Sequence, residues 1–129
     1  MEKDDQIEAI RIVAIDYIEG WYSGDTERIG RSFHPDFVKR KVFVEPRTGR
    51  DVLNHLSATM MLEMTRAGGG KNIPTEQQHN TFTLLDIAST CASVKVESAE
   101  YIDYLHLARL NGRWMIVNVL WERRLEAMI

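Results

Sequence analysis

The stretch that decides the fold is Ala92–Arg123, which reads ASVKVESAEYIDYLHLARLNGRWMIVNVLWER. Its centre is Asn111-Gly112, a pair that favours a two-residue hairpin turn because both residues tolerate positive φ. The run that follows, Trp114–Trp121, is almost entirely apolar. A strand that is apolar on both faces has to be covered on both sides, so we expect packing on one face and a ligand or a second subunit on the other.

Two helices are expected before this stretch. Apolar residues three or four apart predict an amphipathic helix over residues 4–23, which Gly24 would end. Asp25 is the expected N-cap of a short second helix over residues 26–32. His34-Pro35-Asp36 then breaks the helical pattern, because the residue before a proline is pushed out of the helical region.

The middle of the chain is expected to alternate between strand and helix. Residues 37–44 are an expected edge strand, since Lys39-Arg40-Lys41 in its middle favours exposure. A stripe of Leu53, Leu56, Met60 and Met64 predicts a third helix over residues 50–67. Residues 68–78 contain three glycines and Pro74 and are an expected loop.

The end of the chain is expected to form three consecutive long strands: residues 79–88, the strand from Cys91 onwards, and the strand after Gly112. Helices first and a meander of strands last predict an α+β fold, in which the helices pack on one face of a curved antiparallel sheet. Such a sheet encloses a conical interior that could hold a small molecule.

Composition narrows the class of protein. A length of 129 residues suits one domain over residues 1–129, and a hydrophobic content of 44% is enough for a core. A net charge of −3 argues against a nucleic-acid partner, and no apolar run is long enough for a membrane span. The acidic first residues are unlike a secretory signal, so we expect a cytoplasmic protein. The single Cys91 excludes an internal disulfide and is expected to be a small buried residue. No histidine pair has metal-ligand spacing, and we expect neither a metal nor a cofactor.

Four segments together resemble the nuclear transport factor 2-like superfamily: Gly20–Asp25, Phe33–Asp36, Asp103–Leu107 and Asn111–Asn118. Within it they are most similar to the lumazine-binding group, near the SnoaL-like polyketide cyclases. The resemblance implies a cone-shaped pocket lined by the three helices and the concave face of the sheet, and a homodimer formed through the outer sheet face. The superfamily includes ketosteroid isomerase, scytalone dehydratase, polyketide cyclases and non-catalytic binding modules, so the fold does not decide the function.

The resemblance also suggests where a catalytic group would lie. Isomerase and cyclase relatives carry a polar or acidic side chain on the penultimate strand, five residues before its turn, and that position is His106 here. The pocket face of the last strand would then carry Met115, Val117, Val119 and Trp121. This assignment depends on register, because one bulge would exchange the two faces of the strand.

Three residues are candidates for acid–base chemistry. His106 lies among apolar neighbours and could be a general acid or base, or a hydrogen-bonded histidine of the core or an interface. Asp103 falls on the opposite face by strict alternation, where an interface or solvated role is expected. If the register is reversed, Asp103 becomes a pocket carboxylate with a raised pKa. His34, two residues before Asp36, is expected near the pocket mouth or as a helix-end cap.

The expected ligand is a small apolar or aromatic molecule. Tyr17 and Trp21 lie four apart and could form an aromatic wall, although ordinary core packing explains them equally well. The residues expected to contact the ligand are Tyr17, Trp21, Tyr22, His55, Met60, Tyr104, Val117 and Trp121. The resulting hypothesis is a cofactor-free isomerase, dehydratase or cyclase that works by proton transfer. The alternative is a non-catalytic homodimeric module whose cavity is filled by its own side chains.

Overall fold

A computed structural model describes residues 2–124 of the chain. The helices are α1 (Lys3–Ser23), α2 (Thr26–Gly30) and α3 (Ala58–Arg66), with a 3₁₀ turn, η1, at Thr75–Gln77. The strands are β1 (Phe33–Val44), β2 (Asp51–Ser57), β3 (Asn80–Ile87), β4 (Cys91–Ser98), β5 (Tyr101–Leu110) and β6 (Arg113–Arg123).

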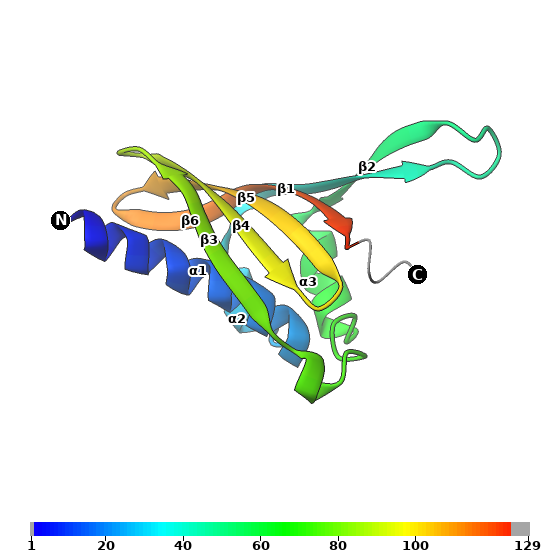
Figure 1. Ribbon diagram of the computed structural model, residues 1–129, viewed down its shortest axis with the longest axis horizontal. Helices are drawn as coiled ribbons and strands as arrows, with labels where there is room; N and C mark the ends of the chain where they lie inside the picture. Colours follow the sequence, from blue (N-terminus) through cyan, green and yellow to red (C-terminus); the bar gives the residue numbers. More distant parts are fainter. Residues whose placement is uncertain (1, 125–129) are drawn as a thin grey trace.

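The six strands form one curved sheet in the order β2-β1-β6-β5-β4-β3. All three helices lie on the same side of it, and the hairpin of β1 and β2 projects beyond them (Figure 1). The expected α+β fold with helices on the concave face is confirmed. The sheet is not wholly antiparallel, because β1 and β6 run parallel to each other.

The end of α1 and the start of α2 lie where the sequence predicts, while α2 ends at Gly30, two residues before the predicted end. Gly24 ends α1 with φ of 71°, and the Asp25 side chain accepts a hydrogen bond from the backbone N–H of Arg28 at the start of α2. A methyl group on Gly20 would lie 2.8 Å from the backbone nitrogen of Ile29. A glycine at position 20 therefore allows α2 to lie directly against α1.

The prediction of one helix over residues 50–67 is wrong in its first half. Residues 51–57 form β2, which pairs with β1 so that Leu53 lies opposite Val42 and His55 opposite Arg40. The same residues alternate in burial, as a half-covered strand does. Ser57 then caps α3 by accepting a hydrogen bond from the N–H of Met60. Leu53 and Leu56 fit a helical spacing, but hydrogen bonds with β1 decide the structure.

Two strand boundaries also differ from expectation. The strand predicted from Cys91 onwards is interrupted after Ser98, and β5 begins at Tyr101. The first strand starts at Phe33, so that His34-Pro35-Asp36 lies within β1, where the pairing with β6 is irregular. The hairpin at Asn111-Gly112 is as predicted, with φ of 52° and 78°.

The core lies between the helices and the concave face. Ile10 and Ala14 of α1 are fully buried there, together with Val94, Leu105 and Val119 of the sheet. Trp114 is 3% exposed and donates a hydrogen bond of 2.6 Å to Oε1 of Gln6. Cys91, which was expected to be buried, is exposed at the start of β4.

One extra residue changes the direction of side chains along β6. Leu107 pairs with Ile116 and His106 pairs with Asn118, so Val117 has no partner of its own on β5. Trp114 and Ile116 before this bulge are buried, and after it the buried residue is Val119. The concave face therefore uses even-numbered positions before the bulge and odd-numbered positions after it.

None of the helices within residues 2–124 is long and apolar enough to cross a membrane.

Candidate functional site

A cavity of about 110 Å³ lies between the helices and the concave face of the sheet. Its polar groups come from α1, β1 and β5, and its apolar walls from α1, β2, α3 and the ends of β5 and β6. The lining residues are Tyr17, Ile18, Trp21, Lys39, Leu56, Met61, Met64, Tyr101, Asp103 and Trp121.

Three polar side chains from different elements meet in this cavity. The Tyr17 hydroxyl donates to Oδ2 of Asp103 at 3.2 Å, and Nζ of Lys39 donates to the same hydroxyl at 2.7 Å. Nζ of Lys39 also lies 3.6 Å from Oδ2 of Asp103. The side chains of Lys39 and Asp103 are only 12% and 5% exposed. We call Tyr17, Lys39 and Asp103 the polar triad.

Burial moves each member of the triad toward its neutral form. Loss of water raises the pKa of Asp103, although the positive charge of Lys39 and hydrogen bonds from Tyr17 and Lys39 oppose the rise. The same loss of water lowers the pKa of Lys39, although the negative charge of Asp103 opposes this decrease. Burial raises the pKa of Tyr17 well above its usual value, and the negative charge of Asp103 adds to this rise. A carboxyl group whose pKa is raised by burial in an apolar cavity holds a proton more readily than an exposed carboxyl group, which is the property that an acid–base group needs.

Aromatic rings surround the triad. Nζ of Lys39 lies 4.9 Å from the ring centre of Trp121 and 5.2 Å from that of Tyr17. Tyr101 packs edge-on against Trp121, with the ring centres 5.2 Å apart. A wider depression of about 370 Å³ shares Tyr101 and Trp121 with the cavity and carries charged groups of Lys41, Glu100 and Arg123. The two rings therefore lie between the cavity and a charged depression on the surface.

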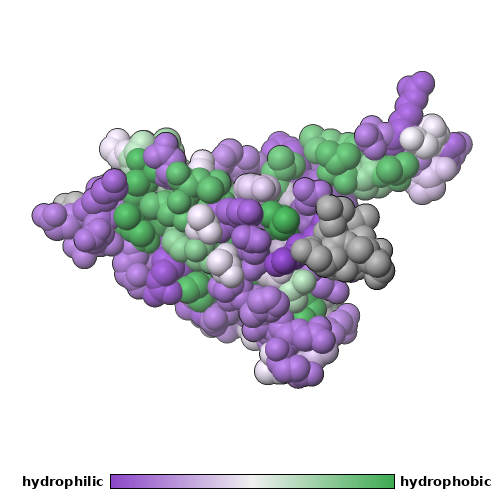
Figure 2. All heavy atoms as spheres, in the orientation of Figure 1, coloured by the Kyte–Doolittle hydropathy of each residue, from purple (hydrophilic) through white to green (hydrophobic). Residues whose placement is uncertain are grey.

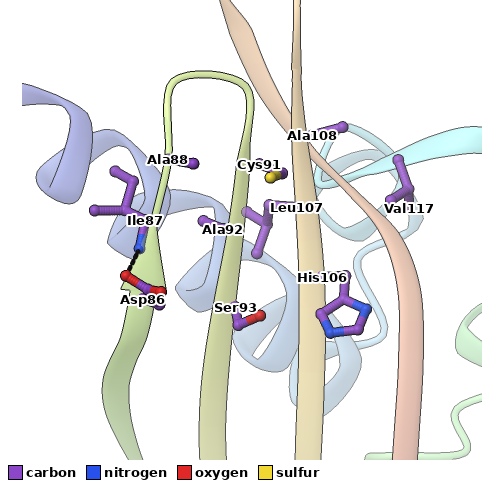
Figure 3. Close-up of a pocket in the computed structure, with 10 residues that line it drawn as sticks. All are labelled: Asp86, Ile87, Ala88, Cys91, Ala92, Ser93, His106, Leu107, Ala108 and Val117. Atoms are coloured by element: carbon purple, nitrogen blue, oxygen red, sulfur yellow. Dashed lines mark hydrogen bonds between the residues drawn. The ribbon is translucent and has the colours of Figure 1, made fainter.

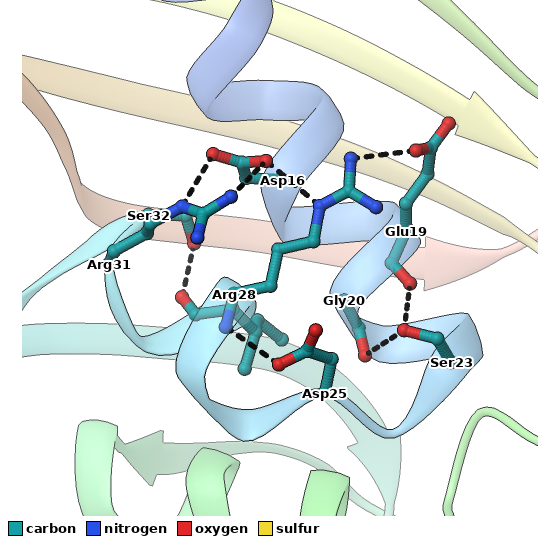
Figure 4. A network of polar contacts seen from close by, with 9 residues as sticks. Asp16, Glu19, Gly20, Ser23, Asp25, Arg28, Arg31 and Ser32 are labelled. Carbon is teal, nitrogen blue, oxygen red and sulfur yellow. Dashed lines mark hydrogen bonds and ion pairs between the residues drawn. The ribbon is translucent and has the colours of Figure 1, made fainter.

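A network of ion pairs holds α1, which supplies Tyr17, against α2. Asp16 accepts hydrogen bonds from Nε of Arg28 at 2.9 Å and Nε of Arg31 at 3.1 Å, and Glu19 accepts from Arg28 at 2.7 Å (Figure 4). Although burial opposes the effect, the hydrogen bonds from Arg31 and Arg28 lower the pKa of Asp16. The network therefore holds the helix that supplies Tyr17 against α2.

The structure brings four of the residues expected at the site into the cavity: Tyr17, Trp21, Asp103 and Trp121. It places His106 on the convex face. Side chains alternate between the two faces along β5, and Asp103, three residues earlier, faces the helices. His106 is exposed, and its Nδ1 lies 3.2 Å from Nδ2 of Asn118. The expected position of His106 inside the pocket is therefore wrong, and the reversed register describes this strand.

His106 instead lines a shallow depression on the convex face. Figure 3 shows it with Ser93 of β4 and Val117, the bulge residue of β6. Val117, which was expected in the pocket, lies here because the bulge turns it to the outer face. Tyr104 is exposed and lines a different surface depression, next to Leu120.

The remaining expected residues also lie outside the cavity. Nδ1 of His34 accepts a hydrogen bond from the N–H of Asp36, so it stabilises the irregular first residues of β1. His55 is exposed on β2, and Met60 is exposed on α3 beside the buried Met61. Tyr22 is buried, but its hydroxyl donates to the carbonyl of His79 and accepts from the N–H of Ala99. That hydroxyl joins the end of α1 to two other segments.

The most important residue that the sequence did not identify is Lys39. Its two basic neighbours favoured a reading of exposure, but alternation along β1 sends Lys39 and Lys41 toward Trp121 and Arg40 toward Asn118 on the other face. The alternation of side chains along a strand, applied to Lys39-Arg40-Lys41, would have placed the two lysines on one face and Arg40 on the other. Within the described residues no group of acidic, histidine or cysteine side chains is arranged to hold a metal ion.

Residues 5–122 match the family model described as "Putative lumazine-binding". The chain belongs to this family. Solved structures with the same fold include an NTF2-like protein of unknown function from Silicibacter pomeroyi, with 17% identity, a TM-score of 0.71, and coverage of 96% of this chain and 100% of that one. Another, from Methylobacillus flagellatus, has 23% identity, a TM-score of 0.67, and coverage of 96% and 95%.

A ketosteroid isomerase-like protein from Erwinia carotovora has 14% identity, a TM-score of 0.59, and coverage of 90% of this chain and 94% of that one. At these identities the likeness shows the fold alone. No curated protein matches the chain.

Proposed function

We propose that this protein is a cofactor-free enzyme that moves a proton on a small apolar or aromatic carbonyl compound, with Asp103 as the acid–base group. The observation that supports this most directly is the polar triad inside a cavity with apolar and aromatic walls. Asp103 would take the proton next to the carbonyl. Tyr17 or Lys39 would donate a hydrogen bond to the oxygen where negative charge develops.

The geometry of the cavity favours a small and flat substrate. Its volume of about 110 Å³ is close to that of one aromatic ring, well below the roughly 300–1,000 Å³ of sites for drug-sized ligands. Trp21 and Trp121 offer flat apolar surfaces, while Met61 and Met64 are side chains that adapt to different shapes. The ketosteroid isomerase-like neighbour has the same fold and agrees with, but does not establish, proton-transfer chemistry.

The test uses a small ketone whose C–H bonds beside the carbonyl are acidic. 1-Phenylpropan-2-one is incubated with the protein in deuterated buffer, and NMR follows the exchange of those hydrogens. We expect exchange faster than in buffer, and a loss of roughly 10²–10⁴-fold in Asp103→Asn, the usual contribution of a general base. Asp86→Asn, which changes an exposed carboxylate on β3, should keep the parent rate. Equal rates in the parent protein and Asp103→Asn would refute the proposal.

The small volume also supports a second candidate, a binding module whose cavity is nearly filled by its own side chains. It predicts that the ketone neither exchanges nor binds. A titration of tryptophan fluorescence tests this, because Trp21 and Trp121 line the cavity. Quenching that saturates would argue against a filled cavity, whether or not the ketone reacts.

We further propose that two copies associate through the convex face of the sheet. Exposed apolar side chains are concentrated there and on the projecting hairpin, where Figure 2 shows a hydrophobic surface. The most exposed are Val42, Val44, Leu53, Leu85 and Leu120. Exposed apolar side chains gathered in this way are typical of an interface. Leu120→Lys should lower the mass measured by light scattering from dimer to monomer, and a parent protein that is already monomeric would refute the association.

A further inference from the structure

Lys39 has surroundings that differ from those of an ordinary strand lysine. Its Nζ lies at the wall of the cavity, within 2.7 Å of a hydroxyl and 3.6 Å of a carboxyl group, and beneath two aromatic rings. Lys95 provides a comparison on the convex face of the same sheet. Its Nζ lies 3.5 Å from Glu97, but the two side chains are about 30% exposed. Lys39 and Lys95 thus have similar carboxylate distances and differ in burial.

We propose that Lys39 is a nucleophile that forms a covalent imine with the carbonyl carbon of an aldehyde or ketone bound in the cavity. The proposal rests on the proposed function, because it concerns the same cavity and gives its acid–base group a specific task. An amine is nucleophilic only when it is unprotonated, and an amine without water around it loses its proton most readily. The Tyr17 hydroxyl, bonded to both Lys39 and Asp103, offers a path for that proton from Nζ to the carboxylate.

The triad supplies every proton that the reaction needs. Neutral Lys39 attacks the carbonyl carbon, a C–N bond forms, and one N–H proton passes to the carbonyl oxygen to give a carbinolamine. Protonated Asp103 then gives its proton to the hydroxyl group, which leaves as water. The products are a positively charged iminium on Lys39, a negatively charged Asp103 beside it, and one water molecule. No oxidant, reductant or second reactant is consumed.

The iminium makes the proposed proton transfer easier. Its positive nitrogen withdraws electrons from the neighbouring carbon, so a C–H bond there becomes more acidic than in the free ketone. Asp103, now a carboxylate, lies within 3.6 Å of Nζ of Lys39 and can take that proton. The substrate class is therefore an aldehyde or ketone with a flat apolar body about the size of a single ring, in keeping with a cavity of about 110 Å³ lined by Trp21 and Trp121.

The imine can be trapped chemically. The protein is incubated with benzaldehyde and sodium cyanoborohydride, which reduces an imine to a stable benzyl amine, and mass spectrometry of peptides locates the added group. We expect one benzyl group on Lys39, added several-fold faster than on Lys95 and saturating with benzaldehyde concentration. Lys95→Met should leave this labelling unchanged, and Lys39→Met should remove it. Lys39→Arg keeps the charge beside Asp103 but cannot form an imine, so a folded and unlabelled arginine variant excludes misfolding as the cause.

The result that overturns the proposal is labelling of Lys39 no faster than of Lys95. The exchange assay with 1-phenylpropan-2-one separates this outcome from failure of the proposed function. Exchange that depends on Asp103 and persists in Lys39→Arg would refute the imine and leave the acid–base role of Asp103. A benzyl group on Lys39 without Asp103-dependent exchange would support the nucleophile and refute the proton transfer.

Discussion

Replacing Asp103 by leucine should destabilise the protein far more than breaking the similar ion pair on the outer face. The Asp103–Lys39 and Glu97–Lys95 pairs have nearly equal separations, 3.6 Å and 3.5 Å. At such distances the attraction is about 4–5 kcal/mol at an effective dielectric constant near 20, but about 1 kcal/mol in water. Removing one partner of a buried pair typically costs about 3–5 kcal/mol, because the other charge is left without compensation. An exposed pair contributes about 0.2–1 kcal/mol.

The two halves of the buried pair should show opposite dependence on pH. In Asp103→Leu the remaining Lys39 has a lowered pKa and resists protonation, so the loss of stability grows as pH falls below the ordinary lysine value of 10.5. In Lys39→Met the remaining Asp103 loses the charge that held its pKa down, and its pKa rises further. The loss of stability in that variant is then small at low pH and grows as pH rises above the ordinary value of 3.8.

A triple variant, Tyr17→Phe with Lys39→Met and Asp103→Leu, should recover the stability. It removes both charges together with the Tyr17 hydroxyl, which would otherwise be buried without partners at a cost of about 1–3 kcal/mol. Replacement of a buried polar cluster by apolar side chains is often neutral or stabilising by about 1–4 kcal/mol. Urea unfolding followed by circular dichroism measures each free energy, with Glu97→Leu as the matched control. The reasoning fails if Asp103→Leu costs no more than Glu97→Leu, or if the three changes simply add.

Two further predictions concern the frame around the site. Asp16→Ala removes the acceptor shared by Arg28 and Arg31 and should cost about 1.5–3 kcal/mol in urea unfolding, the range for hydrogen bonds to a charged group. Glu8→Ala breaks an exposed pair with Arg11 and should cost clearly less, because water screens such a pair. An Asp16→Ala variant as stable as the parent would show that the network does not fix α1. Gly70→Ala places a methyl group in collision with the backbone oxygen of Trp21 and should lower the thermal midpoint by several degrees, because a local overpacking costs about 1–3 kcal/mol. Gly30→Ala approaches only the end of the Leu62 side chain, at 3.3 Å, so an equal loss in both glycine variants would contradict this explanation.

The fold could be predicted further than the site. The Asn111-Gly112 hairpin, the helical stripe of α1 and the caps at Gly24 and Asp25 depend on local chemistry, and each is present at the predicted residues. The change from strand to helix at Ser57 could not be predicted in the same way. Residues 51–57 become a strand because β1 lies beside them, and a helical stripe gives no information about a neighbour that is distant in the sequence.

Predicting the site correctly required knowing which side chains of β5 and β6 face the helices. Strict alternation on β5 separates Asp103 from His106 correctly, but it does not say which of them faces the helices. The resemblance favoured His106, and burial of Asp103 next to Tyr17 and Lys39 shows the opposite choice. On β6, alternation from Trp121 predicted Val117 in the pocket, and the bulge at that position reverses it. Tyr17 and Trp21 were identified because a helix repeats without such interruptions.

The bulge at Val117 also determines how this chain can be compared with its relatives. Positions before and after it follow opposite parity, so an alignment that places a gap one residue away would match concave residues of one protein with convex residues of another. A relative that lost this single residue would bring a different set of side chains into its cavity while keeping most of its sequence. Insertions and deletions at this point of β6 therefore offer evolution a way to change the chemistry of the pocket in one step, without any other substitution along the strand.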